Sequence, residues 1–205
     1  MEMKMNAFEE SLAAQLGVEG FRKVQAVKIG IAGAGGLGSN CAFNLVRSGF
    51  KRFKIVDFDV VDHSNLNRQF YFYDQVGMSK VEALEANLRR INPDIEVETV
   101  VDKIDGDNVG ELFADSDIVV EALDWAESKS MLVAGLLKTG KLLVSASGLA
   151  GIGDTDGITV HRVRENLVIV GDLTSDSRDM PPVSPRVNIA AAKQADVILD
   201  YVVNH

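Results

Sequence analysis

Four glycines carry the clearest chemical signal in this sequence: Gly33, Gly35, Gly36 and Gly38, in the run G-A-G-G-L-G. The apolar segment Ile29–Ala32 precedes them, and apolar residues at helical spacing follow them. A strand, a glycine turn and a helix in this order present backbone N–H groups to a diphosphate, and the glycines let the backbone approach it closely. The spacing alone is common, so the residues that follow must indicate which ligand it serves.

One acid and two cations follow the glycine run. Asp57 ends the second expected strand, where dinucleotide folds place the carboxylate that holds a ribose hydroxyl. Arg68 and Lys80 lie further along, in and after a long polar loop that is expected at the carboxyl ends of the strands. An arginine fork and a lysine point charge suit a triphosphate better than a neutral nicotinamide ring. The alternative is a pair of ordinary surface cations.

Other residues near these motifs allow two interpretations each. Asp59 could contribute to a metal site or to structure, and the aromatic run Phe70–Tyr73 could stack on adenine or belong to the core or an interface. Trp125 is expected to be a packing residue. Cys41 lies on the inner face of the expected glycine helix and is expected to be a small buried hydrophobe.

Composition narrows the class of protein. The 205 residues carry a formal net charge of −9, which argues against general binding to nucleic acid or to an anionic membrane surface. A single cysteine excludes a disulfide framework or a cysteine zinc site within the chain. The start of the chain does not resemble a secretion signal, and no apolar run reaches the ~20 residues of a membrane span. We therefore expect a cytoplasmic protein.

Alternating strand and helix patterns predict an α/β fold, a Rossmann-like, doubly wound and mainly parallel sheet with an antiparallel extension at the carboxyl end. A single domain is expected, with a helical segment at 1–26, a nucleotide-binding core at 27–150, and a hairpin, a loop and a helix at 151–205. The loop Thr174–Pro185 could be a lid or a plain connection. The expected strands are Ile29–Ala32, Phe53–Val56, Ile95–Thr99, Asp117–Glu121, Lys141–Ser145, Ile158–Val163 and Leu167–Val170, and the expected later helices are Ser79–Arg90, Val109–Ala114, Ser128–Lys138 and Ile189–Val203.

Several of these motifs together resemble those of the ThiF/MoeB/HesA family, the bacterial relatives of ubiquitin-activating enzymes. The resemblance rests on G-A-G-G-L-G, I-V-D-F-D, S-N-L-N-R-Q and G-M-S-K-V-E-A. The later stretches E-A-L-D-W-A-E-S-K, S-A-S-G-L-A-G and P-R-V-N-I-A-A-A-K-Q-A are most similar to a shorter ThiF subfamily. The motifs occur in the family's order over roughly residues 28–203, nearly the whole chain.

The resemblance implies an adenylation reaction. Such proteins bind ATP and Mg²⁺ and activate the C-terminal glycine carboxylate of a ubiquitin-like sulfur carrier ending in Gly-Gly, and the ThiS carrier would link the reaction to the thiazole of thiamine. It also implies a role for each matching residue. The glycines would line the phosphate turn, Asp57 and Asp59 would lie at the nucleotide, Asn65, Arg68 and Lys80 would contact the phosphates, and Asp124 would hold Mg²⁺.

The sequence also departs from the longer members of the family. They carry two C-x-x-C pairs for zinc, which are absent here, so no zinc is expected. The carboxy-terminal half has no cysteine to link to a carrier, so adenylate formation could be the whole reaction. A homodimer is expected, but Gln15 stands near the position where relatives supply an arginine across the dimer interface.

Three alternatives to ThiS adenylation stay open. One is activation of another carboxylate, such as that of the MoaD carrier. The second is an NAD(P)-binding oxidoreductase, although no Tyr-x-x-x-Lys or paired His–Asp motif is present. The third is a nucleotide-binding module without turnover.

Overall fold

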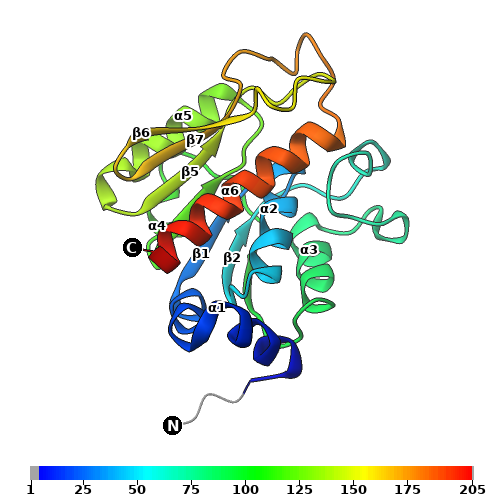
Figure 1. Ribbon diagram of the computed structural model, residues 1–205. Helices are drawn as coiled ribbons and strands as arrows, with labels where there is room; N and C mark the ends of the chain where they lie inside the picture. Colours follow the sequence, from blue (N-terminus) through cyan, green and yellow to red (C-terminus); the bar gives the residue numbers. More distant parts are fainter. Residues whose placement is uncertain (1–4, 205) are drawn as a thin grey trace.

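The computed structural model describes residues 5–204 and contains one seven-stranded sheet in the order β3-β2-β1-β4-β5-β7-β6 (Figure 1). All neighbouring strands are parallel except β6 and β7, which confirms the predicted Rossmann-like α/β sheet with its antiparallel extension. The strands are β1 Lys28–Ala32, β2 Arg52–Val56, β3 Glu96–Val100, β4 Ile118–Glu121, β5 Leu142–Ala146, β6 Thr159–Arg164 and β7 Leu167–Gly171. The α-helices are α1 Ala7–Ala26, α2 Gly36–Arg47, α3 Lys80–Arg89, α4 Val109–Leu112, α5 Ala126–Leu136 and α6 Ser184–Asn204.

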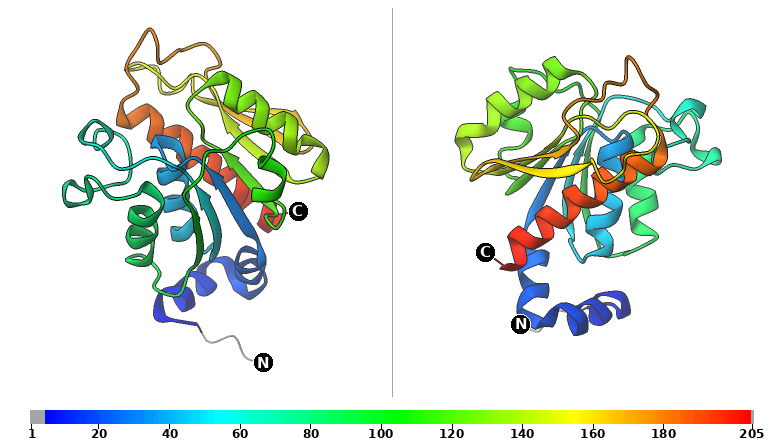
Figure 2. Two further views of the ribbon diagram at one scale, coloured as in Figure 1. Left: turned by 180° about the vertical axis from the view of Figure 1, so that it is seen from behind. Right: turned by 45° about the horizontal axis from the view of Figure 1, so that its top comes forward.

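Helices cover both faces of the sheet. On one face lie α2, α3 and α6, and the opposite face carries α4 and α5, as the view from behind shows (Figures 1 and 2). Strand β1 has side chains that pack against the helices on both faces of the sheet. Ile29 and Ile31 pack into the α2 side, and Ala32 packs into the α5 side, where a Cβ on Gly30 would lie 2.6 Å from the Phe113 ring. Both faces of the central strands are therefore buried, which is usual for parallel strands.

The antiparallel extension leaves the edge of the sheet to β6. Strand β7 pairs with β5 in parallel, and β6, which comes earlier in the chain, lies outside β7.

Helix α6 begins five residues earlier than the predicted Ile189. Pro185 therefore lies in the first turn of α6, although the sequence predicted that the loop would continue through Pro185. Proline is favoured at that position because its missing N–H would have no helical partner there.

Helix α1 packs against the amino-terminal edge of the sheet and bends at Gly17, whose φ is +75°. Asn6 and Glu9 form a reciprocal capping box at its start. None of the helices within residues 5–204 combines the length and the apolar character needed to cross a membrane.

Candidate functional site

A cavity of about 370 Å³ opens at the carboxyl ends of β1, β2 and β4. Ligands of open α/β sheets bind at such a place because the loops there come from strands on either side of the point where strand order reverses. We call it the first cavity. It is lined by Gly33, Gly35, Val56, Asp57, Phe58, Asp59, Lys80, Asp102, Lys103, Ile104, Ala122, Leu123, Asp124, Trp125 and Ser128.

The glycine turn forms one wall of the first cavity. Gly33 has a φ of +96°, a conformation that favours glycine, and its N–H donates to the Val56 carbonyl at 2.9 Å. Tyr71 supports the turn from the other side, since its hydroxyl lies 2.6 Å from the Ala34 carbonyl oxygen. Gly35 precedes the first residue of α2, so the N-terminus of that helix faces the cavity region.

Asp57 lies at the end of β2 and is held from both sides. One carboxylate oxygen accepts the Ala34 N–H at 2.6 Å, and the other accepts the Asp59 N–H at 2.8 Å. Burial raises the pKa of Asp57, and these hydrogen bonds and the nearby charge of Lys80 oppose the rise. Each oxygen accepts one N–H and keeps a further lone pair, so the carboxylate, which lines the cavity, can also accept hydrogen bonds from ribose hydroxyls.

Lys80 is the buried cation of the first cavity. It is 5% exposed, and its ammonium lies 2.7 Å from the carboxylate of Asp59, which is itself half exposed at the cavity. The Lys80 N–H also donates to the Asp59 carbonyl at 3.0 Å. The start of α3 therefore places a positive charge opposite the glycine turn.

We expect a Lys80→Met variant to bind ATP roughly 10- to 100-fold more weakly, because hydrogen bonds to charged groups contribute about 1.5–3 kcal/mol. Isothermal titration calorimetry would measure the change. Lys54→Met is the matched control, since Lys54 is 8% exposed, is ion-paired with Asp115 at 3.1 Å and lines neither this cavity nor the second one described below. Equal losses of ATP affinity in both variants would show that Lys80 acts through stability alone.

A second cavity, of about 540 Å³, lies on the other side of the β4–α5 loop. Its lining comes from the start of α2, the loop that carries Arg68, the loops after β4 and β5, the start of α5, the segment before α6, and α6 itself. It is lined by Gly36, Leu37, Arg68, Ala122–Lys129 without Ser128, Ala146–Ala150, Ser175–Arg178, Pro182 and Val187. Four residues, Ala122, Leu123, Asp124 and Trp125, line both cavities.

Arg68 belongs to the second cavity and is positioned by α2. The side-chain amide of Asn40 donates to the carbonyls of Gly36, at 2.7 Å, and Arg68, at 2.8 Å, which fixes the Arg68 backbone beside the helix start. The guanidinium donates to the Ser64 carbonyl at 3.1 Å and to the Asn67 side chain at 2.8 Å. Both partners are neutral, so its charge is available to an anion.

A buried carboxylate supports the wall between the two cavities. Glu121, at the end of β4, is fully buried and accepts hydrogen bonds from the Leu123 N–H at 2.7 Å and the Ser145 hydroxyl at 2.5 Å. Lys129 of α5 neutralises it at 3.0 Å. Glu121 thus connects the loop after β4 to β5 and α5, which holds the backbone beside Asp124 in place. The Asp124 side chain itself is exposed.

The structure brings most of the predicted site residues together. Gly33, Gly35, Asp57, Asp59 and Lys80 line the first cavity, Gly36 and Arg68 line the second, and Asp124 lines both. Two predicted residues line neither cavity. Gly38 is buried against the glycine turn, and Asn65 accepts the Asp62 N–H at 3.1 Å within its own loop.

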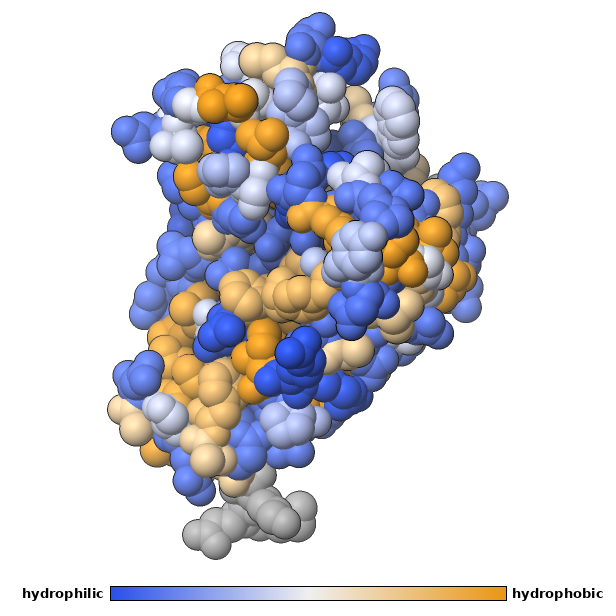
Figure 3. Space-filling view, turned by 90° about the vertical axis from the view of Figure 1, so that its right-hand side faces the viewer, coloured by the Kyte–Doolittle hydropathy of each residue, from blue (hydrophilic) through white to orange (hydrophobic). Residues whose placement is uncertain are grey.

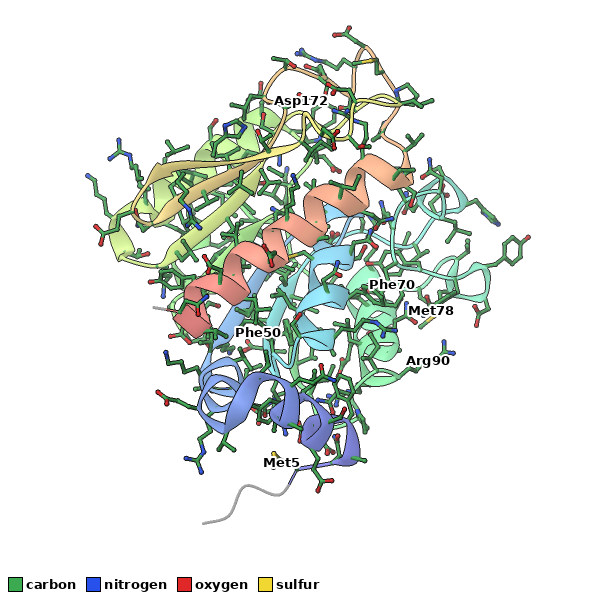
Figure 4. The ribbon with its side chains drawn as sticks, in the orientation of Figure 1. Met5, Phe50, Phe70, Met78, Arg90 and Asp172 are labelled. Carbon is green, nitrogen blue, oxygen red and sulfur yellow. The ribbon has the colours of Figure 1, made fainter. Side chains whose placement is uncertain are left out.

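The aromatic run Phe70–Tyr73 lies away from both cavities, as one of its two interpretations allows, whereas Trp125 differs from expectation. Within this run, Phe70 packs on Phe43 with ring centroids 4.7 Å apart. Figure 4 labels Phe70 on the right of the molecule, the side that Figure 3 turns toward the viewer and that carries apolar patches beside hydrophilic residues. Trp125 was expected to be a packing residue, but it is 69% exposed at the rim of both cavities. Asp102–Ile104, after β3, also line the first cavity and were not predicted.

Comparison with known proteins gives the evolutionary context. The model of the ThiF family matches residues 8–197. The chain is 38% identical over 134 residues to the sulfur carrier protein ThiS adenylyltransferase of Bacillus subtilis (64% of this chain, 40% of the relative). It is 37% identical over 138 residues to the adenylyltransferase and sulfurtransferase UBA4 of Candida glabrata (67% and 32%). The chain thus spans less than half the length of these curated relatives.

Solved structures show the same architecture at lower identity. Escherichia coli tRNA N6-threonylcarbamoyladenosine dehydratase TcdA, in complex with AMP, superposes with a TM-score of 0.84 at 22% identity, covering 100% of this chain and 97% of that one. Escherichia coli MccB with ATP gives a TM-score of 0.77 at 20% identity, covering 98% and 64%. These likenesses establish the fold, and the match over residues 8–197 shows that the chain belongs to the ThiF family.

Proposed function

We propose that this protein is an ATP-dependent adenylyltransferase that activates the C-terminal glycine carboxylate of a ubiquitin-like sulfur carrier of the ThiS kind. One observation carries the proposal: two cavities meet at a shared wall that bears Asp124. A reaction that joins a nucleotide to a second, extended substrate needs two entrances that converge on one point. The similarity to the ThiS adenylyltransferase of Bacillus subtilis supports the same class of substrate.

The first cavity suits the nucleotide. Its glycine turn can approach a diphosphate, the fixed oxygens of Asp57 can accept ribose hydroxyls, and Lys80 can pair with phosphate oxygens. Apolar side chains of Phe58, Ile104 and Leu123 in the same lining offer contacts to the base. ATP placed this way would direct its phosphates toward Asp124 and the second cavity.

The second cavity suits the carrier's tail. A C-terminal carboxylate has a pKa near 3.5, so it is ionised at neutral pH and needs no general base. One of its oxygens would attack the α-phosphorus, the acyl–phosphate bond would form, and the bond to the departing pyrophosphate would break. Arg68 in the second cavity and Lys80 in the first would stabilise the charge on the phosphates.

The donor set at the shared wall fits Mg²⁺. Asp124 presents one exposed carboxylate, and Mg²⁺ is commonly held by one or two carboxylates together with substrate phosphates. Asp124 would hold the ion, which when bound neutralises phosphate charge. Lys80, Arg68 and the glycine turn would orient the same phosphates directly.

We also expect two copies of the chain to form a homodimer, which light scattering after size-exclusion chromatography would test.

The thiazole of thiamine is the product to which a ThiS carrier would deliver sulfur. Cys41 is not suited to sulfur transfer, because it is fully buried and burial raises the pKa of its thiol strongly.

The proposal is tested by ATP–pyrophosphate exchange with Mg²⁺, with and without a ThiS protein ending in Gly-Gly. Exchange is expected only with the carrier, and an Arg68→Ala variant is expected to lose it. Exchange with a MoaD protein in place of ThiS would redirect the substrate assignment. ATP binding without exchange would favour a nucleotide-binding module, and binding of NAD in place of ATP would favour an oxidoreductase.

A further inference from the structure

Arg186, in the first turn of α6, joins three segments of the chain. It is 4% exposed, and its guanidinium donates to the carbonyls of Gly153 and Asp154, each at 2.7 Å, and to the carboxylate of Asp172. Figure 4 shows Asp172 near the top of the molecule, toward the end at which α6 begins, and Met5 at the bottom. We refer to Asp172 and Arg186 as the clasp.

Asp172 also binds the backbone of the segment at 173–183, which follows it in the chain. Its other carboxylate oxygen accepts the N–H groups of Thr174 at 2.8 Å and Ser175 at 2.7 Å. Burial opposes ionisation, but these hydrogen bonds outweigh it and lower the pKa of Asp172 to about 2. The carboxylate is therefore charged at any physiological pH, and it fixes the direction in which the segment leaves β7.

The backbone around the clasp is strained. Among residues 5–204, Asp154 and Leu173 are the two non-glycine residues with left-handed φ, at +45° and +62°. One accepts a hydrogen bond from Arg186, and the other follows Asp172 directly. Such conformations cost about 1–3 kcal/mol each and persist where the surroundings over-determine them.

Close packing adds to this constraint. A Cβ on Gly148 would lie 2.0 Å from a carboxylate oxygen of Asp172, and one on Gly171 would lie 1.6 Å from the Ser147 carbonyl oxygen. The loop after β5 and the segment after β7 can therefore meet only because glycine occupies both positions. The clasp holds together a junction that the backbone alone would not favour.

The two clasp residues line neither cavity, yet the residues they position do. Ser147 and Gly148 form part of one wall of the second cavity, and Ser175–Arg178 form another. The first cavity has no lining residue from any of the segments that the clasp joins. The clasp is thus connected to one of the two cavities.

We propose that the Asp172–Arg186 clasp is a positioning pair that sets the shape of the second cavity and so determines affinity for the carrier's tail, without a part in nucleotide binding. This inference rests on the proposed function. Replacing a buried ion pair with apolar residues is often neutral for stability. The position of the pair at this junction is therefore better explained by the geometry it imposes on the cavity wall.

Two variants test the clasp. Arg186→Lys keeps the charge but presents its donors at a single nitrogen, whereas arginine spreads them over the two nitrogens that reach the carbonyls and the carboxylate. Asp172→Asn removes the charge with little change in size. For both, the KM for a ThiS carrier is expected to rise at least tenfold, while kcat and the calorimetric Kd for ATP stay within twofold. Trypsin is expected to cut after Arg178 faster than in the unaltered protein. Arg162→Lys is the control, because Arg162 forms an exposed ion pair with Asp200 at 3.3 Å, away from both cavities.

The outcomes separate this inference from the proposed function. Absence of carrier-dependent exchange in the unaltered protein would refute the function before any variant is compared. With exchange present, an unchanged KM in folded variants, or equal losses in carrier KM and ATP affinity, would overturn the role of the clasp. Global unfolding of both variants, measured as loss of the thermal transition, would also overturn it, since the pair would then stabilise the whole domain.

Discussion

An Asp124→Asn variant is expected to lose carrier-dependent ATP–pyrophosphate exchange by a hundredfold or more. Asp124 would hold the Mg²⁺ that neutralises the negative charge of the phosphates, and loss of a single group that stabilises transition-state charge typically costs about 10²–10³ in rate. Asp124 lines both cavities, so its carboxylate lies where the α-phosphate and the carrier's carboxylate would have to meet. Asparagine has nearly the same shape, which leaves the supporting contacts of Glu121 in place.

Binding measurements distinguish the role of Asp124 from a general disturbance of the site. Mg²⁺ is expected to tighten ATP binding to the unaltered protein and to have a much smaller effect on Asp124→Asn, as measured by calorimetry with Mg²⁺ or with EDTA. The control is Asp156→Asn, which makes the same charge change at an exposed acid outside both cavities. Full exchange activity in Asp124→Asn would contradict the assignment of the shared wall as the reaction centre.

The first cavity was largely predictable because its chemistry is local in the sequence. The order of strand, glycine turn and helix, followed by Asp57 at a strand end, fixes both the backbone conformation and the edge of the sheet on which the residues lie. Lys80 could be placed there because it begins a helix that returns from the same edge. The structure therefore places most of the residues that were predicted to contact the nucleotide at one cavity.

The remaining parts of the site depend on neighbours that a pattern does not reveal. Asp102–Ile104 line the first cavity because β3 lies beside β2, and nothing in their own sequence indicates that position. Trp125 appeared suited to packing by composition, yet it extends from a loop whose base is held by Glu121. The clasp escaped prediction for the same reason, since its two partners are separated by an irregular segment.

A Gly38→Ala variant is expected to lose about 3 kcal/mol or more of the free energy of unfolding. A Cβ at this position would lie 1.8 Å from the carbonyl oxygen of Gly33 and 3.0 Å from its carbonyl carbon. Overpacking in a core usually costs about 1–3 kcal/mol when side chains can move aside. Here the obstacle is backbone, so helix α2 must move away from the glycine turn, and ATP binding is expected to fall with stability.

Gly35→Ala is the matched control, because it makes the same chemical change three residues earlier. Gly35 has φ −76°, and its Cβ would meet nothing closer than the Gln69 side-chain nitrogen at 3.9 Å. Urea unfolding is expected to show little change for Gly35→Ala, whereas ATP affinity should fall because the new methyl group enters the first cavity. Similar unfolding curves for the two variants would contradict this account. With the expected result, the two glycines of one motif have separate roles: Gly38 lets helix α2 approach the strand, and Gly35 leaves room for the ligand.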